Sequence, residues 1–248
     1  MTAKLLNLLA HDARSDDLTP VDGLASRLSP RRVAEALQTR AHTTNNAFDR
    51  HLPRELRVVS GQHWTPISVA ARAAEWLDEL EVRTVVDIGS GAGKFCVAAA
   101  LAGHCNFMGL EQRPRLVAAA RALARLFEVE DRVCFVEGAL GDVAIPVVDA
   151  YYLYNPFGEN LLGPGEYLDE DVELSDERYQ RDIKTVERLF QQARVGTCIL
   201  IYNGFGGRVP DSYDEVRVDR ELPNVLRMWR KERSAHSGSR VTRVSRST

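Results

Sequence analysis

The sequence lacks the features that would place the protein in or across a membrane. No apolar run in the 248 residues approaches the roughly 20 residues that a membrane span needs. The N-terminal segment becomes acidic before any small-residue cleavage site, so it does not resemble a signal peptide. We therefore expect a cytoplasmic protein with no membrane partner.

Closely spaced cysteines are also missing. Cys96, Cys105, Cys134 and Cys198 form no C-x-x-C pair, whereas zinc sites and disulfide frameworks need tighter patterns. Free cysteines are commonly buried as small hydrophobic side chains in reducing compartments. The spacing thus predicts four buried thiols and no metal site.

An excess of positive charge is absent from the chain as a whole. The net charge is −3, which does not favour a polyanionic partner. Local charge is divided, because residues 165–177 are acidic and would suit a basic peptide, or form a solvated loop. Residues 234–248 are rich in serine and arginine, which predicts a flexible basic tail and points toward nucleic acid. The substrate class, protein or nucleic acid, stays open.

From residue 61 onward, short apolar runs alternate with amphipathic segments. We expect helices at 94–103, 114–127 and 176–194, and strands at 83–88, 106–111, 132–138, 149–157 and 197–205. Residues 213–233 can add two strands that pair antiparallel at an edge. This alternation predicts an α/β fold with a doubly wound, mostly parallel sheet and helices on both faces. We find no internal repeat.

Residues 1–60 lack strand signals and predict a helical N-terminal extension. Ser29 and Pro30 suit the start of one helix. The extension would pack on the main domain, residues 61–233, or act as a lid over a ligand. Thr65 and Pro66 fit the cap and first residue of the next helix.

Three glycines follow the first expected strand, in "VVDIGSGAGKF" at residues 85–95. In an open α/β sheet, this loop lies in the crevice where ligands bind. Gly89 and Gly91 let the backbone turn and approach a ligand, and Gly93 allows the following helix to pack closely. A dinucleotide fingerprint would need glycine where Lys94 stands, and no Walker loop is present.

The segment "DIGSGAG" resembles the first motif of class I S-adenosylmethionine-dependent methyltransferases, which have a seven-stranded sheet. The resemblance extends over residues 61–205 and implies S-adenosylmethionine as the cofactor. It implies contacts to the methionine part of the cofactor from Asp87, Gly89, Ser90, Gly91 and Gly93.

Two later segments extend this resemblance. Glu111 matches the family's acid that accepts hydrogen bonds from the ribose hydroxyls, and Leu110 or Gln112 would form a wall for adenine. After the third strand, Ala139 stands where the family often has an acid, so adenine contacts would come from the backbones of Gly138 and Leu140, with Asp142 as an alternative.

The segment "YNPFGEN" resembles the N-P-P-[YF] motif of methyltransferases that act on planar nitrogens. The resemblance implies that Asn155 and the Pro156 carbonyl hold the target amino group while Phe157 stacks on it. The chain has one proline instead of two, which displaces Phe157 by one place, and an ordinary turn explains the same residues. Similarly, "SGQHWTP" resembles a segment that borders the carboxylate end of the cofactor, through Thr65. Helix capping by Thr65 is the alternative.

The sequence therefore predicts a methyltransferase acting on a nitrogen of a protein side chain or a nucleobase. The main rival is a partner subunit that binds S-adenosylmethionine without catalysis. An NAD-dependent oxidoreductase is disfavoured by the glycine spacing and by the lack of a Tyr-x-x-x-Lys pair.

Overall fold

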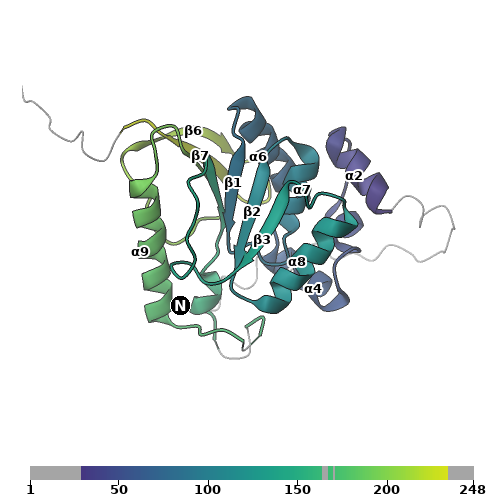
Figure 1. Cartoon of the computed structure of the whole chain (residues 1–248), viewed down its shortest axis with the longest axis horizontal. Helices are drawn as coiled ribbons and strands as arrows, with labels where there is room; N and C mark the ends of the chain where they lie inside the picture. Colours follow the sequence, from purple (N-terminus) through teal and green to yellow (C-terminus); the bar gives the residue numbers. More distant parts are fainter. Residues whose placement is uncertain (1–28, 164–166, 170, 234–248) are drawn as a thin grey trace, which may run out of the picture.

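The computed structural model describes residues 29–163, 167–169 and 171–233, which form one seven-stranded sheet (Figure 1). The strand order is β3-β2-β1-β4-β5-β7-β6. β1 to β5 run parallel, whereas β7 is antiparallel to both β5 and β6. The expected mostly parallel sheet with an antiparallel edge is confirmed. The strands are β1 Thr84–Ile88, β2 Asn106–Glu111, β3 Val133–Glu137, β4 Ala150–Tyr154, β5 Cys198–Tyr202, β6 Tyr213–Asp219 and β7 Leu226–Lys231.

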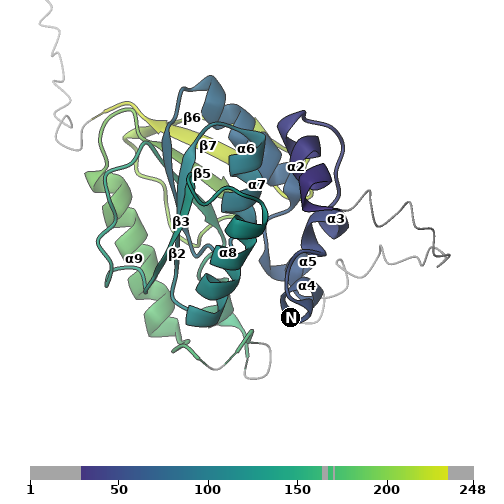
Figure 2. The ribbon, with the colours of Figure 1, turned by 45° about the vertical axis from the view of Figure 1, so that its right-hand side comes forward.

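Helices cover both faces of this sheet, as expected, but unequally (Figures 1 and 2). One face carries α6 (Ile67–Glu79), α7 (Lys94–Ala102) and α8 (Pro114–Leu126), and the other carries α9 (Asp176–Gln192). Successive side chains of β4 alternate between the two cores. Tyr152 packs in the α6–α8 core and Tyr151 in the α9 core.

The uneven covering corrects the expectation for one cysteine. Cys96, Cys105 and Cys198 are buried, but Cys134 is exposed. Its neighbour Phe135 packs in the α6–α8 core, so Cys134 points to the opposite face of β3. The described chain from 138 to 149 joins β3 to β4 without a helix, and this leaves that face of β3 open to solvent.

Within the described residues, four short helices precede α6 and pack on the same side of the molecule as α7 (Figure 2). They are α2 (Pro30–Gln38), α3 (Asn45–Asp49), α4 (Arg54–Val58) and α5 (Ser60–His63). α2 begins at Pro30 as predicted, with Ser29 Oγ accepting the Arg32 N–H. Val33, Phe48 and Leu56 join the core of the main domain. The predicted basic tail, 234–248, and the first part of the extension, 1–28, lie outside the described residues.

The prediction that Thr65 caps α6 is wrong. α6 begins at Ile67 behind Pro66, and the Ile67 N–H donates to Asn45 Oδ1 at 2.9 Å. Thr65 is buried and its hydroxyl shares a hydrogen bond of 2.9 Å with the hydroxyl of Tyr152. The cap therefore comes from α3, across a turn that local sequence spacing does not reveal.

Lys94 fastens the N-terminal helices to the glycine loop. The side chain is 2% exposed, and its Nζ lies 2.8 Å from Asp49 Oδ1, 3.1 Å from Asn45 Oδ1 and 3.1 Å from Ser60 Oγ. Burial lowers the pKa of Lys94, while the charge of Asp49 opposes that change. The first residue of α7 is thus held by polar groups from α3 and α5.

Replacing Lys94 by methionine should destabilise the fold by about 3–5 kcal/mol, because it leaves the Asp49 carboxylate buried without its cation. Urea unfolding followed by circular dichroism measures the change. The matched replacement of exposed Lys184 on α9 should change stability by less than about 0.5 kcal/mol. Equal stability of the two variants would contradict an anchoring role for Lys94.

Candidate active site

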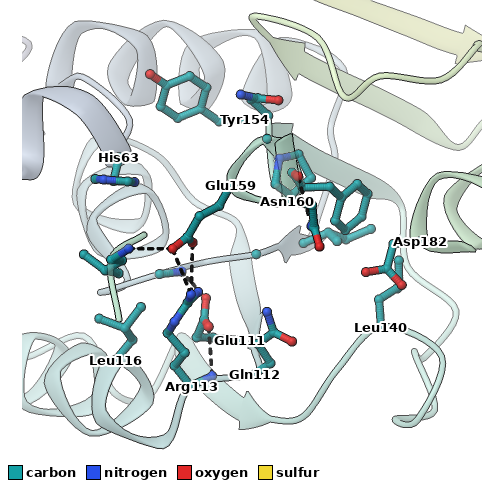
Figure 3. Close-up of a pocket in the computed structure, with 18 of the residues that line it drawn as sticks. His63, Glu111, Gln112, Arg113, Leu116, Leu140, Tyr154, Glu159, Asn160 and Asp182 are labelled. Carbon is teal, nitrogen blue, oxygen red and sulfur yellow. Dashed lines mark hydrogen bonds and ion pairs between the residues drawn. The ribbon is translucent and has the colours of Figure 1, made fainter. Parts of the chain in front are cut away.

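The carboxyl ends of β1, β2, β4 and β5 surround a cavity of about 260 Å³ (Figure 3). Parallel strands bring their carboxyl ends to one edge of the sheet, which is where ligands bind in α/β folds. Most of the predicted site residues line this cavity together, namely Gly89, Gly91, Glu111, Gln112, Gly138, Ala139, Leu140, Asn155, Pro156 and Phe157.

The remaining predicted residues lie beside the cavity or beneath it. Thr65, Asp87 and Ser90 line a small adjoining cavity of about 20 Å³. Gly93 lines neither. Its φ is +77°, and a Cβ there would lie 2.8 Å from the Cβ of Ala120, so glycine is needed for the packing of α7 against α8.

Glu111 connects the second strand to the glycine loop. Its Oε2 accepts the Gly91 N–H at 3.0 Å, and its Oε1 accepts the Arg113 N–H at 2.9 Å. Burial raises the pKa of Glu111, and these backbone hydrogen bonds oppose that change. A carboxylate offers about four acceptor positions, so Glu111 retains capacity for donors from a ligand.

The bare backbone of the glycine loop is closely packed. Gly89 and Gly91 have φ values of +77° and +55°. A Cβ on Gly89 would lie 2.8 Å from the Cβ of Pro156, and one on Gly91 would lie 2.7 Å from Cε3 of Trp64. Gly89 therefore lets the Asn-Pro-Phe segment approach the end of β1, and Gly91 lets the Trp64 ring do so.

Asp87 is a fully buried acid beneath the loop. Burial raises its pKa to about 7, the Cys96 thiol at 3.4 Å opposes this change, and the charge of Glu111 adds to it. A pKa near 7 means that the protonation of Asp87 changes near neutral pH.

Replacing Asp87 by asparagine should flatten the pH dependence of folding. The folded pKa lies above the ordinary 3.8, so the stability that Asp87 gains from its proton is complete below about pH 4 and is lost as pH rises through about 7. This loss is on the order of 2–4 kcal/mol in the wild type. Urea midpoints at about pH 5 and about pH 8 measure it. The exposed Asp142→Asn variant should keep the wild-type profile, and an unchanged profile in Asp87→Asn would contradict the assignment.

Asn155 and Phe157 follow β4 but have different surroundings. Asn155 has φ +40°, and its N–H donates to the Gly204 carbonyl at 3.0 Å. Phe157 is 7% exposed and packs in the α9 core while also lining the cavity. After β4, the cavity is therefore lined by the polar residue Asn155 and by the core aromatic residue Phe157.

Asn203 is a cavity residue that the sequence analysis missed. The segments "LYNPFG" (153–158) and "IYNGFG" (201–206) share one pattern, so the interpretation that the chain has no internal repeat overlooked a short one. The sheet pairs Leu153 with Ile201 and Tyr154 with Tyr202, which places the two asparagines at adjacent strand ends. Asn203 has φ +57° and lines the cavity. The repeated pattern is the signal that reveals it.

The buried Arg113, which follows β2, forms ion pairs with the segment that follows β4. Arg113, 5% exposed, pairs with Glu159 at 3.0 Å and with Asp169 at 2.7 Å, and Figure 3 shows Glu159 reaching toward it. Arg115 also pairs with Asp169 at 3.0 Å. Burial opposes ionisation of Asp169, but the hydrogen bonds from these arginines hold its pKa below the ordinary value. In the acidic stretch, Asp169 is therefore paired with two arginines rather than free for a basic peptide.

Helix α9 contributes two further lining residues that the sequence analysis did not select. Arg178 donates to Gln112 Oε1 at 2.8 Å and to Asp182 Oδ2 at 2.9 Å. Asp182 is 4% exposed and shares with Leu140 the same end of the cavity in Figure 3. The Asp182 carboxylate therefore lies in the region of the cavity where the expected acid is replaced by Ala139. Asp182 lies four residues after Arg178 on the same helix, and this spacing is the sequence signal that predicts their pairing.

Neither a membrane helix nor a metal cluster is found in the part of the chain that the structure describes. No described helix is both long and apolar enough to span a bilayer. No group of three or more histidine, cysteine, aspartate or glutamate side chains among the same residues is arranged to hold a metal ion.

Comparison with known proteins gives relatives in sequence and in structure. No family model matches the chain. Ribosomal protein L11 methyltransferase from Vibrio cholerae serotype O1 is 30% identical over 130 residues, 46% of this chain and 44% of that protein. The chain therefore spans less than half the length of the curated relatives that it matches.

Solved structures resemble a larger part of the chain. An RNA methyltransferase from Salinibacter ruber, in complex with S-adenosyl-L-homocysteine, is 25% identical with a TM-score of 0.48, over 68% of this chain and 93% of that one. Mitomycin 7-O-methyltransferase is 15% identical with a TM-score of 0.50, over 82% of this chain and 60% of that one. The second likeness, together with the strand order, shows that the chain has a methyltransferase-like α/β fold.

Proposed function

We propose that the protein is an S-adenosylmethionine-dependent methyltransferase that acts on an amine nitrogen of a protein substrate. The observation that carries the proposal is that Glu111, the glycine loop and Asn155 line one cavity. The relation to ribosomal protein L11 methyltransferase supports methyl transfer, and it favours a protein over a nucleobase as the acceptor.

The residues around the cavity fit an adenosyl ligand. The Glu111 carboxylate has acceptor capacity for ribose hydroxyls, and Gln112 and Leu140 offer walls for a flat base. The Ser90 hydroxyl is buried, has no hydrogen-bond partner among the residues that the structure describes and lines the smaller cavity, as expected for a group that a ligand satisfies. The cavity of about 260 Å³ lies just below the roughly 300–1,000 Å³ of typical small-molecule pockets, so a bound cofactor would leave little room for water.

When bound, the cofactor supplies an electrophilic methyl group on a sulfonium. The chain's own contribution is to orient the acceptor and exclude water. The Asn155 side-chain oxygen and the Pro156 carbonyl would accept hydrogen bonds from the amine and hold its lone pair toward the methyl. Burial and Arg113 lower the pKa of His63, which Glu159 opposes, so this cavity residue is neutral near pH 7. A neutral imidazole adds no positive charge beside a sulfonium.

Transfer of a labelled methyl group tests this function. The purified protein is incubated with methyl-labelled S-adenosylmethionine and cell extract, and label is expected in the protein fraction. Label in RNA would instead identify a nucleobase acceptor. Tight binding of S-adenosylhomocysteine without transfer to any fraction would favour the partner-subunit alternative, which the single proline after Asn155 and the absent acid at Ala139 motivate. Failure to bind S-adenosylhomocysteine would overturn both.

A further inference from the structure

We propose that a second, open groove beside the cavity binds an acidic stretch of the polypeptide substrate and directs its acceptor side chain past Asn203 toward Asn155. This inference rests on the proposed function. The groove holds about 740 Å³ and lies between the loop after β5, residues 203–209, and the β6–β7 segment, residues 220–229.

Asn203 makes the groove continuous with the cavity, because it lines both. Its backbone N–H donates to the Val225 carbonyl at 3.3 Å, which ties the β5 loop to the start of β7. Across the β4–β5 pair, the Asn155 N–H donates to the Gly204 carbonyl. The loop that lines the groove therefore lies about one strand spacing, roughly 4.8 Å, from the segment that carries Asn155.

The groove combines apolar surface with unpaired positive charge. Leu222, Val225 and Trp229 line it and are only partly buried. Arg208 and Arg220 also line it and are exposed, and no ion pair within the described residues includes either one, whereas Arg227 pairs with Glu215. Two free guanidinium groups beside apolar side chains suit carboxylates interspersed with hydrophobic residues.

The charge surrounding the groove favours a polypeptide over nucleic acid. The β6–β7 hairpin carries acidic as well as basic side chains, because Glu221 is exposed next to Arg220, and Asp214, Glu215 and Asp219 pair with arginines. A phosphate backbone carries a charge at every nucleotide and binds through an extended basic surface. A short acidic peptide, by contrast, needs only two carboxylates to pair with Arg208 and Arg220.

Fluorescence anisotropy with defined probes tests the groove. The main probe is a fluorescein-labelled peptide in which glutamates and leucines alternate around one central lysine. The comparison probes are the same peptide with arginine at every glutamate position, and a uridine oligoribonucleotide of equal length. Each is titrated with the full chain, the double variant Arg208→Glu with Arg220→Glu, and the charge-matched control Lys184→Glu with Arg188→Glu on the exposed surface of α9, outside the groove.

The wild type and the control should bind the acidic peptide alike, and the groove variant should bind it at least about tenfold more weakly. Stronger binding of the RNA than of the acidic peptide would overturn the inference, as would equal binding of the peptide by all three proteins. S-adenosylhomocysteine titrated into each protein separates the two proposals. If it binds and the acidic peptide does not, the groove assignment fails alone; if it does not bind, the proposed function fails.

Discussion

Replacing Asn155 by glycine is expected to slow methyl transfer by about 10²–10³-fold, with the affinity for S-adenosylhomocysteine unchanged within about twofold. The expectation follows from the position of Asn155 at the end of β4, where its amide would orient the acceptor nitrogen. Glycine is the appropriate replacement because the backbone φ is +40°, which glycine adopts without strain and alanine does not. The loss is therefore assigned to the side chain. Initial rates with labelled cofactor and calorimetric titration of S-adenosylhomocysteine measure the two quantities.

Two asparagines provide the comparison for this variant. Asn203 has a similar backbone conformation on the adjacent strand, with φ +57°, so Asn203→Gly should raise the KM for the protein substrate more than it lowers kcat. Asn106 begins β2, at the end of the sheet opposite the cavity, and is exposed, so Asn106→Ala should leave both rate and affinity unchanged. Full turnover by Asn155→Gly would show that the Asn-Pro-Phe segment is an ordinary turn. An equal loss of rate and binding would indicate a structural role.

The sequence analysis succeeded where local pattern determines structure. Short apolar strands, amphipathic helices and a glycine loop are each specified by residues near one another in the chain. Since parallel strands bring their carboxyl ends together, the loop after β1, Glu111 at the end of β2 and Asn155 after β4 could be assigned to one site before any geometry was known. Their gathering around one cavity follows from the topology.

It failed where distant segments meet. The cap of α6 comes from Asn45, and the partner of Lys94 is Asp49, although each looks locally like part of an independent helix. The pairing of Arg113 with Glu159 and the entry of Asp182 into the cavity depend on how the segment after β4 and α9 pack over β2. Periodicity identifies which residues of a helix are buried, but it does not identify their partners.

A missing helix is as hard to predict from sequence as a contact between distant segments. Cys134 alternates correctly in an apolar strand, and burial follows only if a helix covers its face of β3. The chain between β3 and β4 has no helix in the described residues 138–149, so the pattern of β3 was interpreted correctly and its surroundings were not.

Replacing Gly91 by valine is expected to abolish binding of S-adenosylhomocysteine, an affinity loss of at least about 100-fold. The φ of +55° is strongly unfavourable for a β-branched residue, and the added Cβ would overlap the Trp64 ring. Either the loop or Trp64 must move, which would disturb the Gly91 N–H bond to Glu111 and narrow the cavity that both residues line. Calorimetric titration measures the affinity, and circular dichroism establishes that the variant is folded.

The control for backbone strain is Gly196→Val, because Gly196 has φ +91° but open space where its Cβ would lie, and it precedes β5 at the end of the sheet away from the cavity. Both variants should lose stability through strained backbone, by about 1–3 kcal/mol, but Gly196→Val should retain the wild-type affinity. Glu111→Gln gives a second measurement without a strained φ. It keeps the size of the side chain but replaces one acceptor oxygen by a donor, so either the Gly91 or the Arg113 N–H loses its acceptor and binding should weaken at least about tenfold. A folded Gly91→Val protein with normal affinity would mean that the cofactor does not lie against the glycine loop. The affinity of Glu111→Gln would then show whether the cofactor contacts the end of β2.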